Sequence, residues 1–108
     1  ALPILQLAGG GMQLLDTSEI YYLETRSRML YYHTAKGEFA VRGSLQGAEK
    51  QLAVYHFVRC NQCYLVNLQY VKGVENDFAL VGEARLEISR RQRAAFLTAV
   101  ASYIGGVL

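Results

Sequence analysis

The feature that most constrains the fold of this chain is residues 57–71, with the sequence FVRCNQCYLVNLQYV. An apolar arm at 57–58 gives way to a polar run at 59–63, and a second, largely apolar arm follows from 64 to 71. β-Branched and aromatic residues dominate both arms, and they favour a pleated, half-buried surface. The stretch therefore predicts two strands joined by a corner that presents polar side chains, with the rest of the chain forming sheet that holds it.

The first part of the chain predicts short antiparallel strands. The glycines at 9–11 separate two apolar runs and favour a sharp bend, because glycine adopts positive φ without steric cost. Residues 16–19 predict a turn or a single helical turn that caps itself. Strands are expected at 4–8, 12–15, 20–24, 29–34 and 39–42, of which the last three form an antiparallel meander.

Two helices are expected. Ser44 is a suitable N-cap for a short helix near 44–52, in which Leu45, Ala48 and Leu52 recur at helical spacing. Beyond the corner, the apolar residues at 78–81 and the alternating apolar and charged residues at 85–88 predict a hairpin with one solvent-exposed face. Ser89 then begins a final helix near 90–104, and the glycines at 105–106 are expected to end it.

The composition favours one folded domain. The chain has 108 residues, 52% of them hydrophobic, which suffices for a core and argues against disorder. We interpret 1–108 as a single domain, cut from a longer protein because it begins with Ala1. The net charge of +2 does not by itself imply nucleic acid. The arginines are clustered, however, at 26 and 28 and again at 85, 90, 91 and 93.

The two cysteines, Cys60 and Cys63, have the spacing C-x-x-C. A zinc site would require two further Cys or His ligands, and His33 and His56 are not arranged as a second pair. A thioredoxin-like motif should open a helix, whereas a strand is expected here. We therefore expect no metal and no cofactor, with both cysteines acting as small reduced hydrophobes; reversible oxidation remains open as a form of regulation. We expect no enzyme activity either, because the sequence shows no Ser-His-Asp order, no carboxylate pair in a plausible pocket and no metal-ligand set.

The order and spacing of several segments resemble the LytTR family of bacterial DNA-binding domains. The resemblance covers about Ile4 to Tyr103. Its strongest part is Phe57-Val58-Arg59 followed by Leu65-Val66-Asn67 and Val71. The other matching segments are Ile20-Tyr21-Tyr22-Leu23-Glu24, a basic turn, Tyr32-His33-Thr34, Gly37, Leu45, Glu49 and Leu86-Glu87-Ile88-Ser89-Arg90-Arg91.

The resemblance implies a mainly β fold, with about ten short strands in three small antiparallel sheets. The resemblance also implies a function: such domains form the output domain of cytoplasmic response regulators and follow a receiver domain in the chain. They bind direct-repeat promoter sites in double-stranded DNA, place loop residues in major grooves and bend the duplex. A dimer on DNA would be compatible with such repeats.

Three loops carry the DNA contacts of the family, and the resemblance assigns residues to each. The first holds Arg26 and Arg28, the second Asn61 and Gln62, and the third Arg90 and Arg91. Arginine can donate to guanine through two bonds, and Asn or Gln can bind adenine in the same way. The second loop departs from the family, whose members commonly carry His, a basic residue and Ser there, so a different base preference is expected.

Plainer interpretations remain open for these residues. Arg26 and Arg28 could form a solvated turn, and Arg90 and Arg91 the wet face of a helix, although the helix macrodipole disfavours cations at a helix start. Arg59 could pair with Glu24 or another carboxylate. The alternative function is a β-rich protein-interaction module on the same scaffold. Arg26 or Arg28, Gln62 and Arg91 on one side of the molecule would favour DNA binding.

Overall fold

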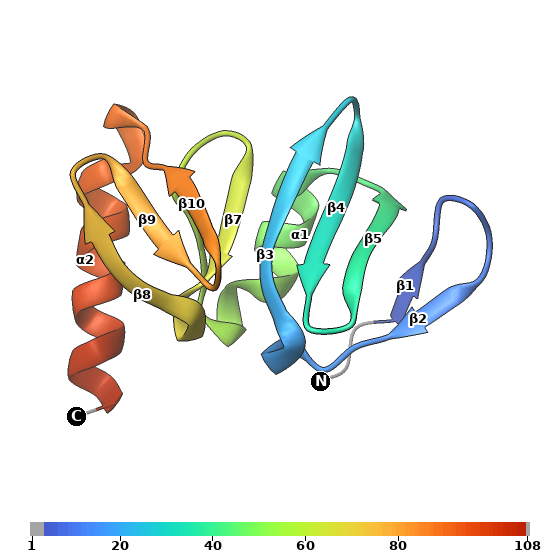
Figure 1. The fold of residues 1–108 in the computed structure, drawn as a ribbon, viewed down its shortest axis with the longest axis horizontal. Helices are drawn as coiled ribbons and strands as arrows, with labels where there is room; N and C mark the ends of the chain where they lie inside the picture. The colour runs from blue at the N-terminus through green and yellow to red at the C-terminus, as the bar shows by residue number, and fades with distance from the viewer. Residues whose placement is uncertain (1–3, 108) are drawn as a thin grey trace.

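A computed structural model describes residues 4–107, which form ten strands and two α-helices (Figure 1). The strands make a two-stranded sheet of β1 and β2, a five-stranded sheet in the order β5-β4-β3-β7-β6, and a three-stranded sheet in the order β10-β9-β8. The mainly β fold predicted from the sequence is confirmed. The strands are β1 (Ile4–Gln6), β2 (Met12–Leu14), β3 (Ile20–Arg26), β4 (Met29–Thr34), β5 (Gly37–Arg42), β6 (Phe57–Arg59), β7 (Tyr64–Asn67), β8 (Val71–Glu75), β9 (Phe78–Val81) and β10 (Ala84–Glu87).

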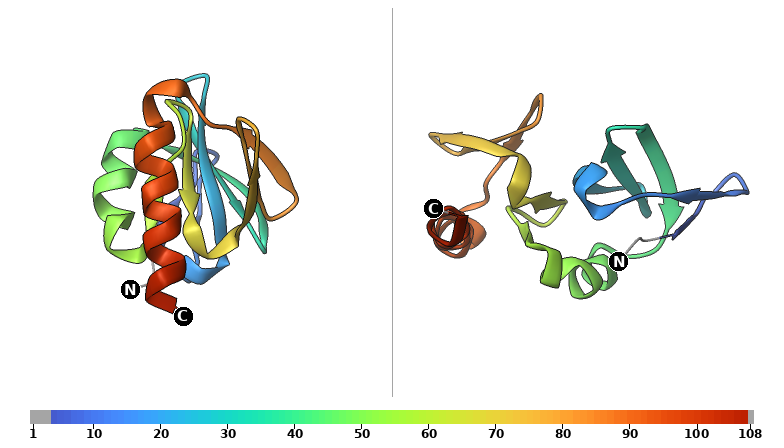
Figure 2. Two further views of the ribbon diagram at one scale, coloured as in Figure 1. Left: turned by 90° about the vertical axis from the view of Figure 1, so that its left-hand side faces the viewer. Right: turned by 90° about the horizontal axis from the view of Figure 1, so that it is seen from below.

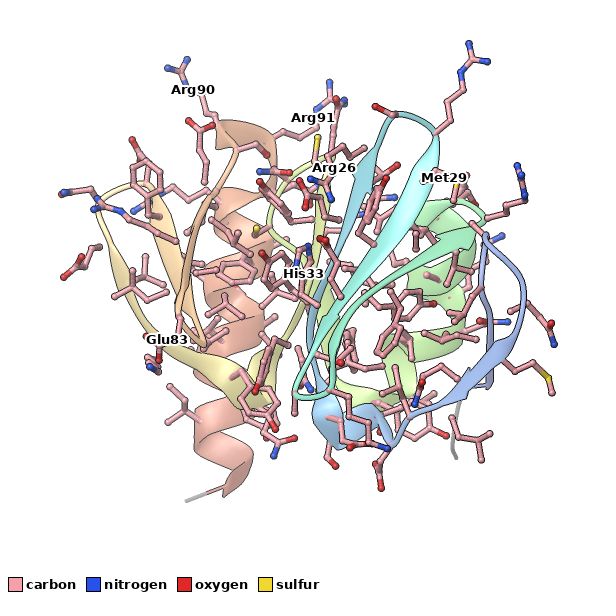
Figure 3. The ribbon with its side chains drawn as sticks, turned by 45° about the vertical axis from the view of Figure 1, so that its right-hand side comes forward. Arg26, Met29, His33, Glu83, Arg90 and Arg91 are labelled. Carbon is pink, nitrogen blue, oxygen red and sulfur yellow. The ribbon has the colours of Figure 1, made fainter. Side chains whose placement is uncertain are left out.

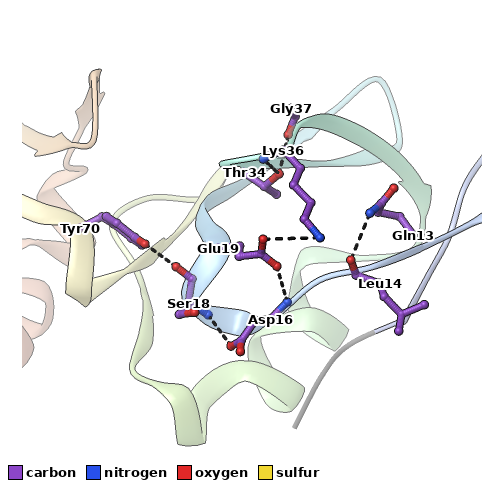
Figure 4. Close-up of polar contacts among 9 residues, drawn as sticks. All are labelled: Gln13, Leu14, Asp16, Ser18, Glu19, Thr34, Lys36, Gly37 and Tyr70. Carbon is purple, nitrogen blue, oxygen red and sulfur yellow. Dashed lines mark hydrogen bonds and ion pairs between the residues drawn. The ribbon is translucent and has the colours of Figure 1, made fainter.

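A self-capping helical turn, η1 (Thr17–Glu19), links the first hairpin to the five-stranded sheet. The Asp16 carboxylate accepts a hydrogen bond from the Ser18 N–H at 3.0 Å, and the Asp16 N–H donates to Glu19 at 2.8 Å (Figure 4). Both free donors at the start of the turn are thereby satisfied. The Tyr70 hydroxyl donates to the Ser18 carbonyl, which ties this turn to the segment that precedes β8.

The predicted meander of β3, β4 and β5 forms one half of the five-stranded sheet. Buried and half-buried residues alternate along β4, as expected for a strand with one face on a core. A two-residue turn, Ser27-Arg28, joins β3 to β4, with φ of 53° and 66°. Positive φ at both central residues defines the turn type that matches the twist of a hairpin.

The corner between β6 and β7 joins the sheet to the second half of the molecule. β7 pairs with both β6 and β3, so that Leu65 faces Arg59 on one side and Leu23 on the other. Asn67 ends β7 and is buried; its side-chain amide donates to the Ile20 carbonyl at 2.9 Å. The following residues, Leu68–Tyr70, form a helical turn (η3), where the sequence suggested a continuing strand.

Each helix covers a separate hydrophobic core, and both helices lie on the same side of the sheets (Figure 2). The helix α1 (Leu45–Leu52) is capped by Ser44 and buries Leu45, Ala48 and Leu52 against the five-stranded sheet. The helix α2 (Arg90–Val107) packs on the three-stranded sheet, where Phe96 is completely buried. Burying one such side chain contributes about 1.5–3 kcal/mol.

The C-terminal helix is longer than the sequence suggested. It was expected to end at Gly105, but it continues through both glycines to Val107. A glycine ends a helix where it adopts the left-handed conformation, and Gly105 instead keeps the helical one. No helix within residues 4–107 combines the length and apolarity that crossing a bilayer requires.

Candidate nucleic-acid interface

A surface depression of about 710 Å³ lies where three loops meet at one end of the molecule. These loops are the β3–β4 turn, the corner between β6 and β7, and the start of α2, all at the upper edge of Figure 1. The outer face of the β9–β10 hairpin forms another wall. Four of the predicted DNA-binding residues line it, namely Arg26, Asn61, Gln62 and Arg91, together with Glu24, Thr25, Cys63, Tyr64, Phe78, Arg85, Glu87, Ser89 and Gln92.

The corner at 60–63 is bonded to the segments that carry the other two loops. The Thr25 N–H, at the end of β3, donates to the Cys63 carbonyl at 2.9 Å. The Ser89 N–H, just before α2, donates to the Cys60 carbonyl at 2.9 Å. These main-chain bonds fix Arg26 and Arg91 in register with the corner, although the three segments are far apart in the sequence.

Asn61 uses its side chain inside the corner. The Nδ2 atom donates to the Glu87 carbonyl at 2.6 Å, and Oδ1 accepts from the N–H groups of Cys63 at 2.6 Å and Tyr64 at 3.1 Å. An amide oxygen has two lone pairs, so Oδ1 is fully used. Reading adenine through two bonds would require this oxygen, and the geometry therefore gives Asn61 a role in holding the loop.

Gln62, next to it, is differently placed. Its side chain is exposed and forms no hydrogen bond within residues 4–107, while its main-chain carbonyl accepts from Arg59 at 3.2 Å. Arg59 also donates to Glu49 on α1 at 3.1 Å. Sequence analysis suggested Glu24 or another carboxylate as the partner of Arg59. The carboxylate is that of Glu49, and the pair braces the corner from the side of α1.

Arg26 is held over the meander. Its guanidinium pairs with Glu38 at 3.1 Å and lies 3.9 Å from the centre of the Tyr31 ring. Glu24, on the same strand, binds His33 at 3.0 Å. Arg26 is thus oriented but still about half exposed, and it lines the depression beside the corner.

The other predicted arginines differ in position. Figure 3 shows Arg26 and Arg91 close together at one end of the molecule, with Arg90 extending away from them. Arg28 lies in the β3–β4 turn and, like Arg90, does not line the depression. Within residues 4–107, Arg28, Arg90 and Arg91 are exposed and form no ion pair. Their donors are therefore free for a ligand.

The charge of the depression is mixed, because three arginines and two glutamates line it. Glu24 is engaged by His33, whereas Glu87 is exposed and has no ion-pair partner among the described residues. Sequence reasoning did not assign Arg85 to the site. The signal was present in the alternation of Arg85 and Glu87 with Leu86 and Ile88, which put the two charged residues on the wet face of the strand.

The two cysteines have opposite environments and are both free thiols. Cys60 is fully buried, and burial raises the pKa of its thiol from 9.0 to about 12. Cys63 is exposed in the depression. Within residues 4–107 no group of three or more Cys, His, Asp or Glu side chains is placed to hold a metal ion.

Comparison with known proteins gives a consistent result. The family model of the LytTr DNA-binding domain matches residues 10–101. A search of solved structures finds the LytTr DNA-binding domain of a Bacillus cereus protein described as a methyl-accepting/DNA response regulator. The two chains are 21% identical, and the match has a TM-score of 0.81 over 93% of this chain and 96% of the other. A search of curated proteins finds no match.

Proposed function

Since the chain belongs to the LytTr DNA-binding domain family, we propose that it reads specific sequences in double-stranded DNA as the output domain of a transcriptional regulator. The family is one of DNA-binding domains and not of enzymes. The observation that carries the proposal is the meeting of Arg26, Gln62 and Arg91 in one depression, from three segments that the corner bonds together. Preorganised donors on a rigid support suit groove recognition, because little entropy is lost on binding.

Each residue has a role in this proposal. Arg91 and Gln62 read base edges in the major groove, where arginine suits guanine and glutamine suits adenine. Arg26 is restrained by Glu38 and meets either a base or a nearby phosphate. Arg28 and Arg90, at the margins, bind phosphates, which sets affinity and salt dependence. Asn61 holds the corner in shape.

The wider arrangement is also proposed. Direct-repeat promoter sites, a receiver domain ahead of this one in the full-length protein, and a dimer formed on DNA all fit a response regulator. The mixed charge of the depression favours one second candidate: a protein partner whose surface carries both signs, bound on the same scaffold.

Selection from a pool of randomised duplexes at two salt concentrations tests the proposal. We expect one short motif to be enriched, with affinity that falls as salt rises. Arg91→Ala should then cost about 1–3 kcal/mol at the selected site. Lys36→Ala is the matched control, because it removes an exposed cation from the β4–β5 turn, at the opposite end of the sheet, and should change little. Absence of enrichment would favour the protein-interaction module.

A further inference from the structure

Arg85 lies in the wall of the depression that none of the three loops provides. It stands on β10, where it faces Leu80 of β9, and Glu87 on the same strand faces Phe78. On the other face of this hairpin, Ala79, Val81 and Leu86 are buried in the core beneath α2. The outer face of the hairpin therefore lines the depression with Phe78, Arg85 and Glu87.

The Arg85 guanidinium lies over the Phe78 ring, with its central carbon 4.3 Å from the ring centre. Within residues 4–107 it forms no ion pair. A guanidinium stacked on an aromatic ring is fixed in orientation but keeps the N–H donors at its edges free. Arg26 is different, because Glu38 already takes one of its donors.

We propose that Arg85 is an additional DNA-contacting residue that binds a backbone phosphate beside the bases read by the loops. The inference rests on the proposed function. Because the side chain lies flat over Phe78, it does not project into a groove, and the part of a duplex that reaches it is the sugar–phosphate backbone. Arginine binds phosphate through two parallel hydrogen bonds, for which a fixed planar group is well suited.

The contact predicts a particular pattern of binding. A phosphate contact carries no sequence information, so its loss weakens binding to matched and scrambled duplexes alike. A variant that lacks this contact also releases one counterion less when it binds DNA. The slope of the logarithm of the binding constant against the logarithm of the salt concentration is therefore smaller by about 1. A residue that reads a base would instead weaken only the matched duplex.

The test is a titration of the selected duplex and a scrambled duplex over a salt series, with thermal unfolding measured alongside. We expect Arg85→Gln, which keeps a planar group over Phe78, to weaken both duplexes by at least about tenfold, because the charge-assisted hydrogen bonds to the phosphate are lost. Its salt slope should be shallower by about 1. Arg85→Lys should keep the slope, and Lys36→Ala serves again as the control.

Three results would overturn the contact. Unchanged affinity and slope in Arg85→Gln, or a loss of thermal stability without a loss of affinity, would mean that Arg85 only covers Phe78. A loss confined to the matched duplex would mean that it reads a base. The failure of the proposed function is distinguishable, because the unsubstituted chain would then show no selected motif in the first place.

Discussion

The Asn61 side chain donates a hydrogen bond of 2.6 Å to the main-chain carbonyl of Glu87, joining the corner to the last strand before α2. The same side chain accepts bonds from two main-chain N–H groups within the corner. One residue therefore sets both the shape of the second loop and its distance from the third. Its neighbour Gln62 projects from the structure that Asn61 maintains.

Substitution of these two neighbours should separate structure from recognition. We expect Asn61→Ala to lower the free energy of unfolding by about 1–2 kcal/mol, because three main-chain groups lose a partner. It should also weaken DNA binding, because the corner loosens. Gln62→Ala should weaken binding at the selected site without changing stability. Denaturant unfolding and DNA titration of both variants check this, and equal stability losses would contradict it.

Arg28 occupies a turn position that glycine would fill more comfortably. Its φ of 66° lies in the left-handed region, which costs a residue with a side chain about 1 kcal/mol relative to glycine. We therefore expect Arg28→Gly to be more stable than Arg28→Ala by about this amount. Both variants should bind DNA more weakly than the unsubstituted chain, because both lose the cation. Thermal unfolding gives the order of stability, and the reverse order would show that the turn carries no strain.

Glu87 faces the depression with a negative charge that DNA must approach. We expect Glu87→Gln to tighten binding several-fold, with the gain shrinking as salt rises because the repulsion is screened. The bond to Asn61 should survive, because it uses the Glu87 main-chain carbonyl. Glu83→Gln is the control, since Glu83 is an exposed glutamate of the same hairpin that does not line the depression; its one ion pair is the exposed contact with Lys72 at 3.3 Å. Weaker binding by Glu87→Gln would mean that this carboxylate itself accepts a bond from a base.

The buried thiol of Cys60 should make stability depend on alkaline pH. Its pKa is raised from 9.0 to about 12 in the folded chain, because burial disfavours the thiolate. The unfolded chain therefore loses this proton first. The contribution of the Cys60 thiol to the free energy of unfolding is fully present below pH 9, and it is lost progressively as the pH rises toward 12. Unfolding of Cys60→Ala measured between pH 9 and 10 should show a flatter dependence than that of the unsubstituted chain.

Alkylation gives an independent measure of the two thiols. Iodoacetamide at pH 8 should modify Cys63, which is exposed, and leave Cys60 unmodified until the chain unfolds. Mass spectrometry of the labelled peptides identifies the modified residue. Rapid labelling of Cys60 in the folded chain would show that the corner opens readily.

Local patterns predicted the elements of this fold well. The glycines at 9–11, the self-capping turn at 16–19 and the Ser44 cap are signals carried by a few adjacent residues, and each appears as expected. The length of α2 was less predictable, because the conformation of Gly105 depends on the helix that precedes it. The pairing of β3 with β4 and of β4 with β5 was predicted from adjacent segments. The pairing of β3 with β7 was not predicted, since no short segment encodes which distant strand lies beside it.

The candidate site likewise combines features that adjacent residues predict with features that depend on the tertiary fold. The sequence placed Gln62 at the corner, Arg26 in a polar turn and Arg91 at the start of the last helix, and the family resemblance suggested that these three regions cooperate. In the structure Arg26 is the last residue of β3, and Arg91 lies in the first turn of α2. The bonds that engage Asn61 and Arg59 could not be read from the chain, because Glu87 and Glu49 approach them only through the tertiary fold. Arg85 was overlooked for a related reason. The sequence pattern shows that Arg85 lies on the solvent-exposed face of its strand, but it does not show which other segments of the chain lie next to that face.

The central position of β3 has a consequence for the order of folding. β3 meets β4 after a two-residue turn, but it meets β7 only after the chain has closed a long loop that includes α1. Contacts that require such a closure form slowly, because the chain loses conformational entropy in closing the loop before the new contacts stabilise it. The meander can therefore assemble while the corner is still unformed. We expect a chain that has formed only the meander to lack the depression, because the corner and the start of α2 are needed to complete it. Binding of a duplex would then require the completely folded domain.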